Sequence, residues 1–264
     1  MNAGRPVGTL LRDWRERRRL SQLALATLAE VSTRHLSFVE SGRSSPSREL
    51  LLHLADQLDV PLRERNRLLL AAGYAPAFAE RALTDEGMLA AREAVRLVLD
   101  GHEPYPALAI DSHWNVQAAN RCVAPLLVGV LPHLMTPKLN VLRVSLHPEG
   151  LAPRILNLAR WRAHLLGRLA RDLELRADPA LHALMLELQR YPSPKLNEPT
   201  RPYEQSDIVV PLQLRTEAGV LSLISTTTVF GSPLEVSLSE LAIEAFFPAD
   251  NTTARLLKEA HAAV

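Results

Sequence analysis

The sequence has little lysine and only one cysteine. Three of its 30 basic residues are lysine and the rest are arginine, a bias that a GC-rich genome can produce, so it is not evidence of phosphate binding. As the single cysteine, Cys122 cannot close an internal disulfide or form a zinc site built on several cysteines, which argues against a zinc finger and for a reducing compartment. The nine histidines show no His-x-x-x-His or Glu-paired spacing, so we expect no metal site.

Long hydrophobic runs are also missing. No stretch approaches the roughly 18 to 20 uncharged apolar residues of a membrane span. The first residues, Met1 to Gly8, lack the basic-then-apolar run of a signal peptide. We therefore expect a cytoplasmic protein with no membrane partner. The net charge of +1 predicts no bulk attraction to nucleic acid, so any basic surface must be local.

The chain is long enough for two domains, with 264 residues and 47% hydrophobic content. The sequence predicts an all-α domain of five helices over residues 1–75, a linker with a connecting helix over 76–103, and an α+β domain with an antiparallel sheet over 104–264. Residues 1–80 hold 12 Arg against 9 acids, whereas residues 206–264 hold 3 basic against 7 acidic residues. We expect salt-sensitive affinity for a polyanion in the first domain.

Helix signals in the first domain are short apolar stripes preceded by capping residues. Leu11 and Trp14 belong to the first stripe, and Ser21 and Ser47 can cap the second and fourth helices. The third helix is expected from Ser32 to Glu40. Pro61 suits the first position of a fifth helix, which Gly73 would end.

The segment Ser21–Arg43 is the most informative part of the chain. It predicts two short helices about a tight turn, packed together by Leu25, Leu28 and Val31, with Leu36 and Val39 on the inner side of the second helix. The side chains expected to face outward near the start of that second helix are Ser32, Thr33, Arg34, His35 and Ser37. Such groups read base edges in a DNA major groove, while Gln22 and Arg43 can hold phosphates.

This pattern resembles the lambda-repressor/Cro (XRE) class of helix-turn-helix domains over about Thr9 to Gly73. The resemblance implies a partner of double-stranded DNA. Glu30 departs from the class, which often has glycine at that turn to take a left-handed conformation; another residue costs about 1 kcal/mol there. We expect a turn of slightly different shape. Because five short helices supply few base contacts, we also expect a homodimer. The alternative is a helical protein-interaction module.

The second half alternates strands and helices. Short strands are expected at Leu108–Ile110 and Trp114–Ala118, helices at Leu151–Leu175 and Leu181–Tyr191, and further strands at Asp207–Leu214 and Val220–Phe230 around a Glu217-Ala218-Gly219 hairpin turn. The segment Leu238–Phe247 suits strand or helix, and Asp250 can cap a last helix. In Val220–Phe230, residues with hydroxyl groups alternate with apolar residues. This pattern fits a sheet that lines a partly polar cavity, and it fits equally a sheet whose face is fully packed.

Four segments of the second half are informative as an ordered set: Ile110–Val116 with Ala119–Arg121, Asn140–Leu151, Asn157–Arg162 and Glu240–Asp250. In this order they resemble the MmyB-like family of bacterial transcription regulators. The resemblance covers nearly the whole chain together with the first domain. It implies a PAS-like ligand-binding domain, an antiparallel sheet flanked by helices with an internal pocket, and a ligand such as a fatty acid.

A carboxylate head group needs cationic donors at the rim of an apolar pocket. Arg143, His147 and Arg154 lie close together in sequence, between a strand-like segment and a helix, and are the predicted anchors. Asn157 and Trp161 complete the predicted ligand-binding set, although Trp114 and Trp161 also suit the core. Alternatively, Arg143 and Arg154 pair with acids such as Glu149 or Asp172.

No motif in the sequence indicates catalysis or a cofactor. There is no phosphate-cradling glycine loop and no Gly-x-Ser-x-Gly nucleophile elbow. The sequence therefore predicts a DNA-binding regulator with a small-ligand sensor and no enzyme activity. Two alternatives stay open. A protein-docking second domain would have a filled sheet core, and an enzyme tied to DNA binding would have titratable groups clustered in a cleft.

Overall fold

The computed structural model describes residues 5–176, 178–192, 209–230 and 235–262, and its contacts divide the chain into two compact units. The first unit runs to Arg81 and takes in residues 235–239; the second begins at Ala82. The sequence placed the boundary after residue 75 and treated 76–103 as a linker, whereas the structure assigns the connecting helix to the second unit.

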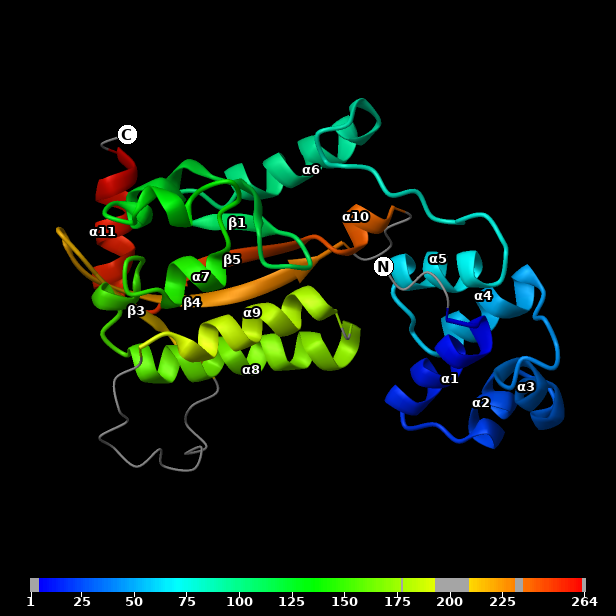
Figure 1. The fold of residues 1–264 in the computed structure, drawn as a ribbon. Helices are drawn as coiled ribbons and strands as arrows, with labels where there is room; N and C mark the ends of the chain where they lie inside the picture. Colours follow the sequence, from blue (N-terminus) through cyan, green and yellow to red (C-terminus); the bar gives the residue numbers. More distant parts are fainter. Residues whose placement is uncertain (1–4, 177, 193–208, 231–234, 263–264) are drawn as a thin grey trace. The chain divides into compact units, whose positions relative to one another are not determined.

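The first unit is all-α. Its helices are α1 (Val7–Arg17), α2 (Gln22–Leu28), α3 (Thr33–Glu40), α4 (Arg48–Gln57), α5 (Leu62–Ala71) and the short α10 (Val236–Ser239) (Figure 1). The side chains of Ser21, Ser32 and Ser47 accept backbone N–H bonds at the starts of α2, α3 and α4, which confirms the caps expected at Ser21 and Ser47. Pro61 precedes α5 as its N-cap rather than forming its first residue, and Gly73 follows it with φ 84°.

The core of the first unit combines apolar stripes from α1 to α5. Leu11, Leu25 and Leu36 are fully buried in it. A buried ion pair also lies there: Arg15 of α1 donates to both carboxylate oxygens of Glu40 at the end of α3, at 2.7 and 2.9 Å. Gly8 allows the close approach of these two helices, because a Cβ there would lie 2.3 Å from the carbonyl oxygen of Val39.

The second unit is α+β. Its helical elements are η1 (Glu86–Met88), α6 (Leu89–Asp100), η2 (Arg121–Leu127), η3 (Pro132–Leu134), α7 (Val141–Leu146), η4 (Ala152–Arg154), α8 (Leu158–Arg176), α9 (Pro179–Arg190) and α11 (Asn251–Ala262). Its strands are β1 (Ala107–Ile110), β2 (Val116–Ala119), β3 (Leu212–Thr216), β4 (Gly219–Val229) and β5 (Ala242–Pro248).

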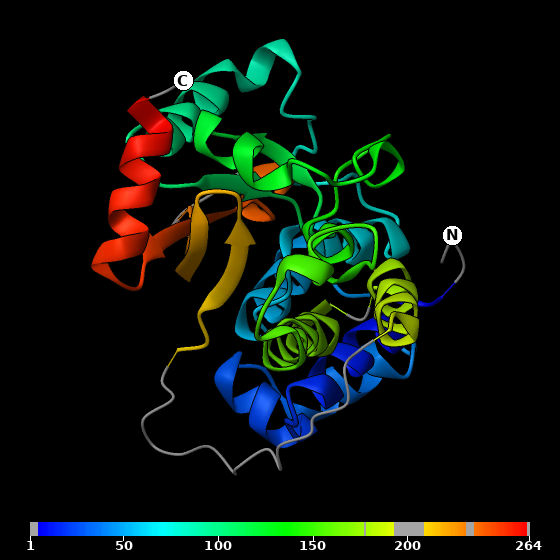
Figure 2. The same cartoon turned by 90° about the vertical axis from the view of Figure 1, so that its left-hand side faces the viewer.

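The five strands form one antiparallel sheet in the order β2-β1-β5-β4-β3. The β3–β4 hairpin turns at Glu217 and Ala218, which confirms the predicted turn. Asp250 accepts the backbone N–H of Thr253 at 2.7 Å and so caps α11 as expected. In Figure 1, α8 and α9 lie side by side on one side of the sheet and α6 on the other, while Figure 2 shows α11 beside the β3–β4 hairpin.

Two local predictions need correction, and one alternative that the sequence left open is decided by the structure. The strand-like segment before His147 is the helix α7, capped by Asn140. The helix expected from Leu151 begins only at Leu158, because η4 and a bridge between Ile155 and Leu214 precede it. The segment around Leu238 divides into α10 and the strand β5. Residues 207–208 of the predicted strand lie outside the described residues.

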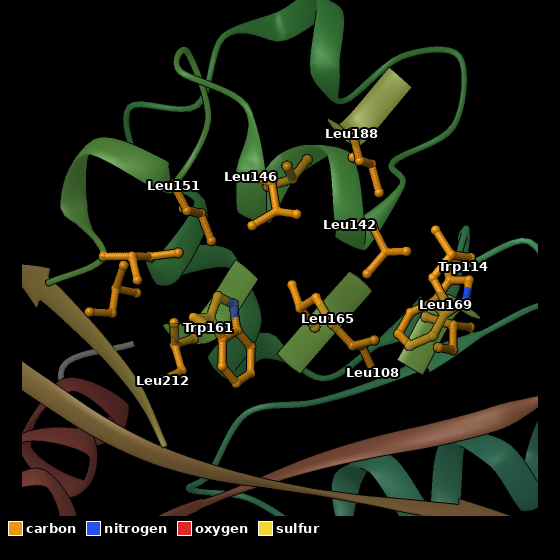
Figure 3. Packing of buried hydrophobic residues seen from close by; sticks show 14 of the residues in the cluster. Leu108, Trp114, Leu142, Leu146, Leu151, Trp161, Leu165, Leu169, Leu188 and Leu212 are labelled. Atoms are coloured by element: carbon orange, nitrogen blue, oxygen red, sulfur yellow. The ribbon is translucent and has the colours of Figure 1, made fainter. Parts of the chain in front are cut away.

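The core of the second unit lies between the sheet and the helices α7, α8 and α9. Trp161 and Leu165 of α8, Leu142 of α7 and Leu212 of β3 point into the same interior in Figure 3. Trp114 and Trp161 are 5% and 4% exposed, which confirms them as core residues. None of the helices in the described residues is long and apolar enough to cross a membrane.

Candidate functional site

The first candidate site is the pair α2 and α3 with the turn between them. Leu25 of α2 and Leu36 and Val39 of α3 are fully buried, as predicted. Leu28 was expected to join them but is 52% exposed, because the helix ends there with its side chain on the outer face. Glu30 takes the left-handed conformation with φ 54°. The turn therefore keeps the backbone that glycine favours, and the expected change in its shape does not occur.

The outward face of α3 carries most of the predicted base-reading residues. Arg34 and His35 are exposed, Thr33 and Ser37 are partly buried. Ser32 is the N-cap of α3, and its side-chain oxygen accepts the His35 backbone N–H at 3.1 Å. These side chains sit on the first two turns of α3, the part of a recognition helix that meets base edges.

Two cations flank one aromatic ring at this face. The Arg34 and Arg43 guanidinium carbons lie 5.3 and 5.9 Å from the ring centroid of Phe38. Such cation–π contacts hold long side chains in place without neutralising them. Gln22 was expected to donate a hydrogen bond to a DNA phosphate. In the structure its amide nitrogen instead donates to Glu40 at 2.8 Å, so Gln22 extends the buried Arg15–Glu40 pair.

The second candidate site is a cavity in the core of the second unit. It holds about 150 Å³ and is lined by residues of β1 to β5, η2, α7 and α8. Leu108, Val144, Leu165 and Leu223 are among the apolar side chains that form its wall. A cavity of this size and lining accommodates a group about as large as benzene. The alternative of a fully packed sheet core, which the protein-docking hypothesis predicted, is therefore not what the described residues form.

Most of the polar groups at the cavity, namely Ser145, Arg168 and Glu244, already have partners within the protein. Arg168 of α8 is ion-paired with Glu244 of β5, and Thr227 donates to the same carboxylate at 2.7 Å. The Arg168 guanidinium also lies 4.7 Å from the ring centroid of Trp114. Ser145 accepts the indole N–H of Trp161 at 2.9 Å. Because these partners satisfy one another, the cavity suits an apolar part of a ligand.

Of the five predicted ligand-binding residues, the cavity lining includes Trp161 but not the others. Arg143 donates to both carboxylate oxygens of Glu187 at 2.8 Å, which raises the pKa of Arg143 and lowers that of Glu187. The alternative that Arg143 pairs with an acid is therefore confirmed, although the acid is Glu187 and neither Glu149 nor Asp172. Asn157, which directly precedes α8, donates to the Pro211 carbonyl at 2.7 Å and accepts the backbone N–H of Gln213 at 3.2 Å, and so ties the start of α8 to β3.

His147 and Tyr191 extend the Arg143–Glu187 cluster. Their ring centroids are 4.9 Å apart, and the Tyr191 hydroxyl donates to Glu187 at 2.5 Å. Burial, followed by the bond to Glu187, raises the pKa of Tyr191 above its usual range. The structure thus brings Arg143 and His147 together, but in a polar cluster apart from the cavity wall.

Arg154 lies in a different setting from Arg143. It lines a second, groove-like pocket of about 620 Å³ together with Leu221, Leu256 and Leu257. Its guanidinium donates to the Leu126 carbonyl, and no carboxylate partner for it occurs in the described part of the chain. Burial lowers its pKa. Leu126 lines both the groove and the cavity.

Sequence reasoning missed Arg168, Glu244 and Ser145. A signal for Arg168 was present, since it follows Trp161 by seven residues and therefore lies on the same face of α8. Glu244 had no such signal: alternation along β5 puts it opposite the apolar Ile243, and both are buried. Only the packing of α8 onto the sheet brings the two charges together.

Two family models match the chain. The MmyB-like transcription regulator ligand binding domain matches residues 91–260, and a helix-turn-helix domain matches residues 6–68. None of the curated proteins matches the chain. The first match spans the sheet, the cavity and the helices that cover it, and the second spans α1 to most of α5. The chain therefore belongs to the MmyB-like transcription regulators, with a helix-turn-helix domain that binds DNA followed by a ligand-binding domain.

Proposed function

We propose that this regulator is cytoplasmic, reads double-stranded DNA as a homodimer through α3, and is controlled by a fatty-acid-like ligand in its second unit. The observation that carries the ligand proposal is the apolar cavity between the sheet and α7 and α8, whose charged groups, Arg168 and Glu244, are paired with each other. A cavity persists in a folded core at a cost of about 20 cal/mol for each Å² of its surface, so an apolar occupant stabilises the domain.

The size of the cavity limits how a long ligand binds. Pockets for drug-sized ligands have about 300 to 1,000 Å³, whereas this cavity has about 150 Å³ and the adjacent groove about 620 Å³. A long acyl chain therefore needs both spaces. It passes Leu126, which borders both, with its methyl end in the cavity.

Arg154 is the proposed anchor for the acid end of that ligand. It lines the groove and lacks a carboxylate partner among the described residues, so a ligand carboxylate meets an unpaired guanidinium. Arg143, in contrast, already holds Glu187 with both of its donor nitrogens. Of the sequence-predicted set, Arg154 and Trp161 keep a direct role in this proposal, and Arg143, His147 and Asn157 support the surrounding fold.

The test is mass spectrometry of a denaturing solvent extract of the freshly purified full-length protein. We expect a stoichiometric acyl species. The variant Val144→Phe fills the cavity, so its extract should contain no acyl species. The control variant Val220→Phe, at a position 43% exposed, should still yield the acyl species. Arg154→Met weakens retention of added fatty acid, and Arg143→Met does not. An empty extract, with no binding of added fatty acids, would favour a protein-docking domain instead.

The ligand controls DNA binding only if it binds two dimer arrangements with different affinity. Two helix-turn-helix heads must meet half-sites about 34 Å apart, so a small rotation between subunits weakens binding sharply. Sedimentation of the full-length protein on a selected operator tests the dimer. We expect two copies for each operator; one copy for each operator contradicts this arrangement.

A further inference from the structure

Three metal-ligating side chains meet in the second unit, at the edge of the groove that Arg154 lines. They are Glu103 from the loop between α6 and β1, Cys122 from η2 and His261 from the last turn of α11. One ligand atom from each lies within 4.8 Å of the others. The Cys122 Sγ is 3.4 Å from Nδ1 of His261, and the His261 Nε2 is 3.9 Å from an oxygen of Glu103.

We propose that Glu103, Cys122 and His261 form a binding site for Zn²⁺. Zinc bonds of about 2.0 to 2.3 Å in a tetrahedron place ligand atoms roughly 3.3 to 3.8 Å apart. One ligand atom from each side chain lies within 4.8 Å of the others, and side-chain movements that bring a single ring nitrogen of His261 toward both partners close the tetrahedron. Sulfur, imidazole and carboxylate together favour zinc, because Mg²⁺ and Ca²⁺ prefer oxygen ligands alone.

Arg121 occupies the place of a cation in this cluster. Its guanidinium donates to Glu103 at 2.8 Å and lies 2.9 Å from the His261 Nε2. The Arg121 side chain is 52% exposed, so it can turn into solvent when a metal ion arrives. The existing contact shows that a ring nitrogen and a carboxylate oxygen are directed at one positive charge, which is what a metal ion requires.

At Cys122, metal binding is an exchange of a proton for the metal ion. On binding, the sulfur–hydrogen bond breaks, the proton leaves to solvent and a sulfur–zinc bond forms, with no change in oxidation state.

The three ligands leave a fourth position open. Arg121, Cys122 and His261 all line the groove next to the cavity, so water or a small anion can reach the metal from there. The site also joins α11 to η2, and η2 supplies Val123, Leu126 and Leu127 to the cavity wall. Zinc would thus fix one wall of the ligand cavity.

A second cluster in the described residues fits a metal less well and serves as a control. It contains His133, His147 and Glu149. His133 and Glu149 are exposed, and Nδ1 of His147 already accepts the backbone N–H of Glu149 at 3.1 Å. In a neutral imidazole the other nitrogen then carries the proton and has no lone pair for a metal.

Cobalt titration of the full-length, metal-free protein tests the proposal. With a reductant that contains no thiol, we expect one equivalent of Co²⁺ to give the thiolate-to-cobalt charge-transfer band, and Zn²⁺ to displace it. Cys122→Ser and His261→Ala should remove the band and weaken zinc binding at least about tenfold, the lower end of what losing even an outer-sphere partner costs. His133→Ala should change neither.

Arg121→Ala distinguishes a built site from adventitious surface binding. Removal of the competing guanidinium should tighten Zn²⁺ binding in calorimetry, whereas Arg96→Ala, at an exposed position of α6, should leave it unchanged. The proposal is overturned if neither the native protein nor Arg121→Ala gives the thiolate band, or if Cys122→Ser binds Zn²⁺ as tightly as the native protein. Circular dichroism of each variant shows whether it is folded.

Discussion

Glu30 combines a strained backbone with an exposed side chain in the turn between α2 and α3. Its φ of 54° costs a non-glycine residue about 1 to 2 kcal/mol, whereas glycine adds about 0.4 to 1 kcal/mol of unfolded-state entropy. We predict that Glu30→Gly stabilises the first unit by about 0.5 to 1 kcal/mol, measured by amide hydrogen exchange in α2 and α3. Glu30→Ala keeps the strain and should give no gain. Equal exchange in the two variants would show that the turn is not strained.

The buried pair of Arg15 and Glu40 gives a second prediction at this scale. The side chains are 9% and 2% exposed, so removal of one partner leaves an uncompensated charge in the core. Glu40→Leu should destabilise the first unit by about 3 to 5 kcal/mol in thermal unfolding followed by circular dichroism. The double variant Arg15→Met with Glu40→Leu should recover most of that loss. If it is no more stable than Glu40→Leu, an unpaired charge is not the cause.

His164 links the pH to the stability of the second unit. It stacks on Trp161 with ring centroids 5.4 Å apart, and burial followed by Arg168 and Arg171 lowers its pKa below 6.5. Because the unfolded chain binds the proton more tightly, the contribution of His164 is full above about pH 6.5 and is lost as the pH falls through the lower folded pKa.

Urea unfolding between pH 7.5 and 5 checks this sign. His164→Phe keeps the stacking on Trp161 and should reduce the loss of stability on acidification, while His182→Phe, at an exposed position of α9, should not. An unchanged pH dependence in His164→Phe would assign the acid sensitivity to other groups.

At the scale of elements, capping residues and strand alternation were readable from the sequence. Ser21 and Ser47 cap their helices as expected, and the two-residue turn after Thr216 sets the β3–β4 register. The segment Val141–Leu146 misled because its apolar residues and two valines suit a strand as well as a buried helix. What decides it is the Asn140 cap, whose side chain accepts from the Arg143 backbone N–H.

The cavity could not be predicted at this scale. Its wall combines residues from five strands and three helical elements. The acid that pairs with Arg143 likewise lies 44 positions away, in α9. Periodicity reports which face of an element is apolar, but not which faces leave a space between them. The family resemblance predicted that a pocket exists. Its position became visible only from the packing of α7 and α8 on the sheet.

The element that reads DNA is predicted to be α3. Arg34→Ala and His35→Ala should each reduce discrimination between the preferred and mismatched bases by about 1 to 3 kcal/mol, because both side chains are exposed on its first turns. Arg43→Ala should weaken binding to all sequences alike and reduce the salt slope by about one. Binding-site selection and salt titration measure these effects. Unchanged selectivity in Arg34→Ala and His35→Ala would place the reading surface elsewhere; Arg96→Ala is the charge-matched control.

At the scale of the whole molecule, ligand and operator must affect each other equally. If the ligand changes the operator affinity by some factor, thermodynamic linkage requires the operator to change the ligand affinity by the same factor. We predict such reciprocity, with coupling of about 1 to 3 kcal/mol, in fluorescence and calorimetric titrations of the full-length dimer. A fatty acid that the extract identifies is the titrant.

The variant Val144→Phe tests whether the coupling between ligand and operator depends on the cavity. Val144→Phe should bind operator with one affinity whether or not fatty acid is present, because it leaves no space for the apolar end of the ligand. Arg154→Met should keep the coupling but require more ligand, since the carboxylate loses its cation while the cavity is unchanged. Coupling that persists in Val144→Phe would mean that the ligand acts from the groove alone, because the filled cavity can no longer tell the two states of the dimer apart.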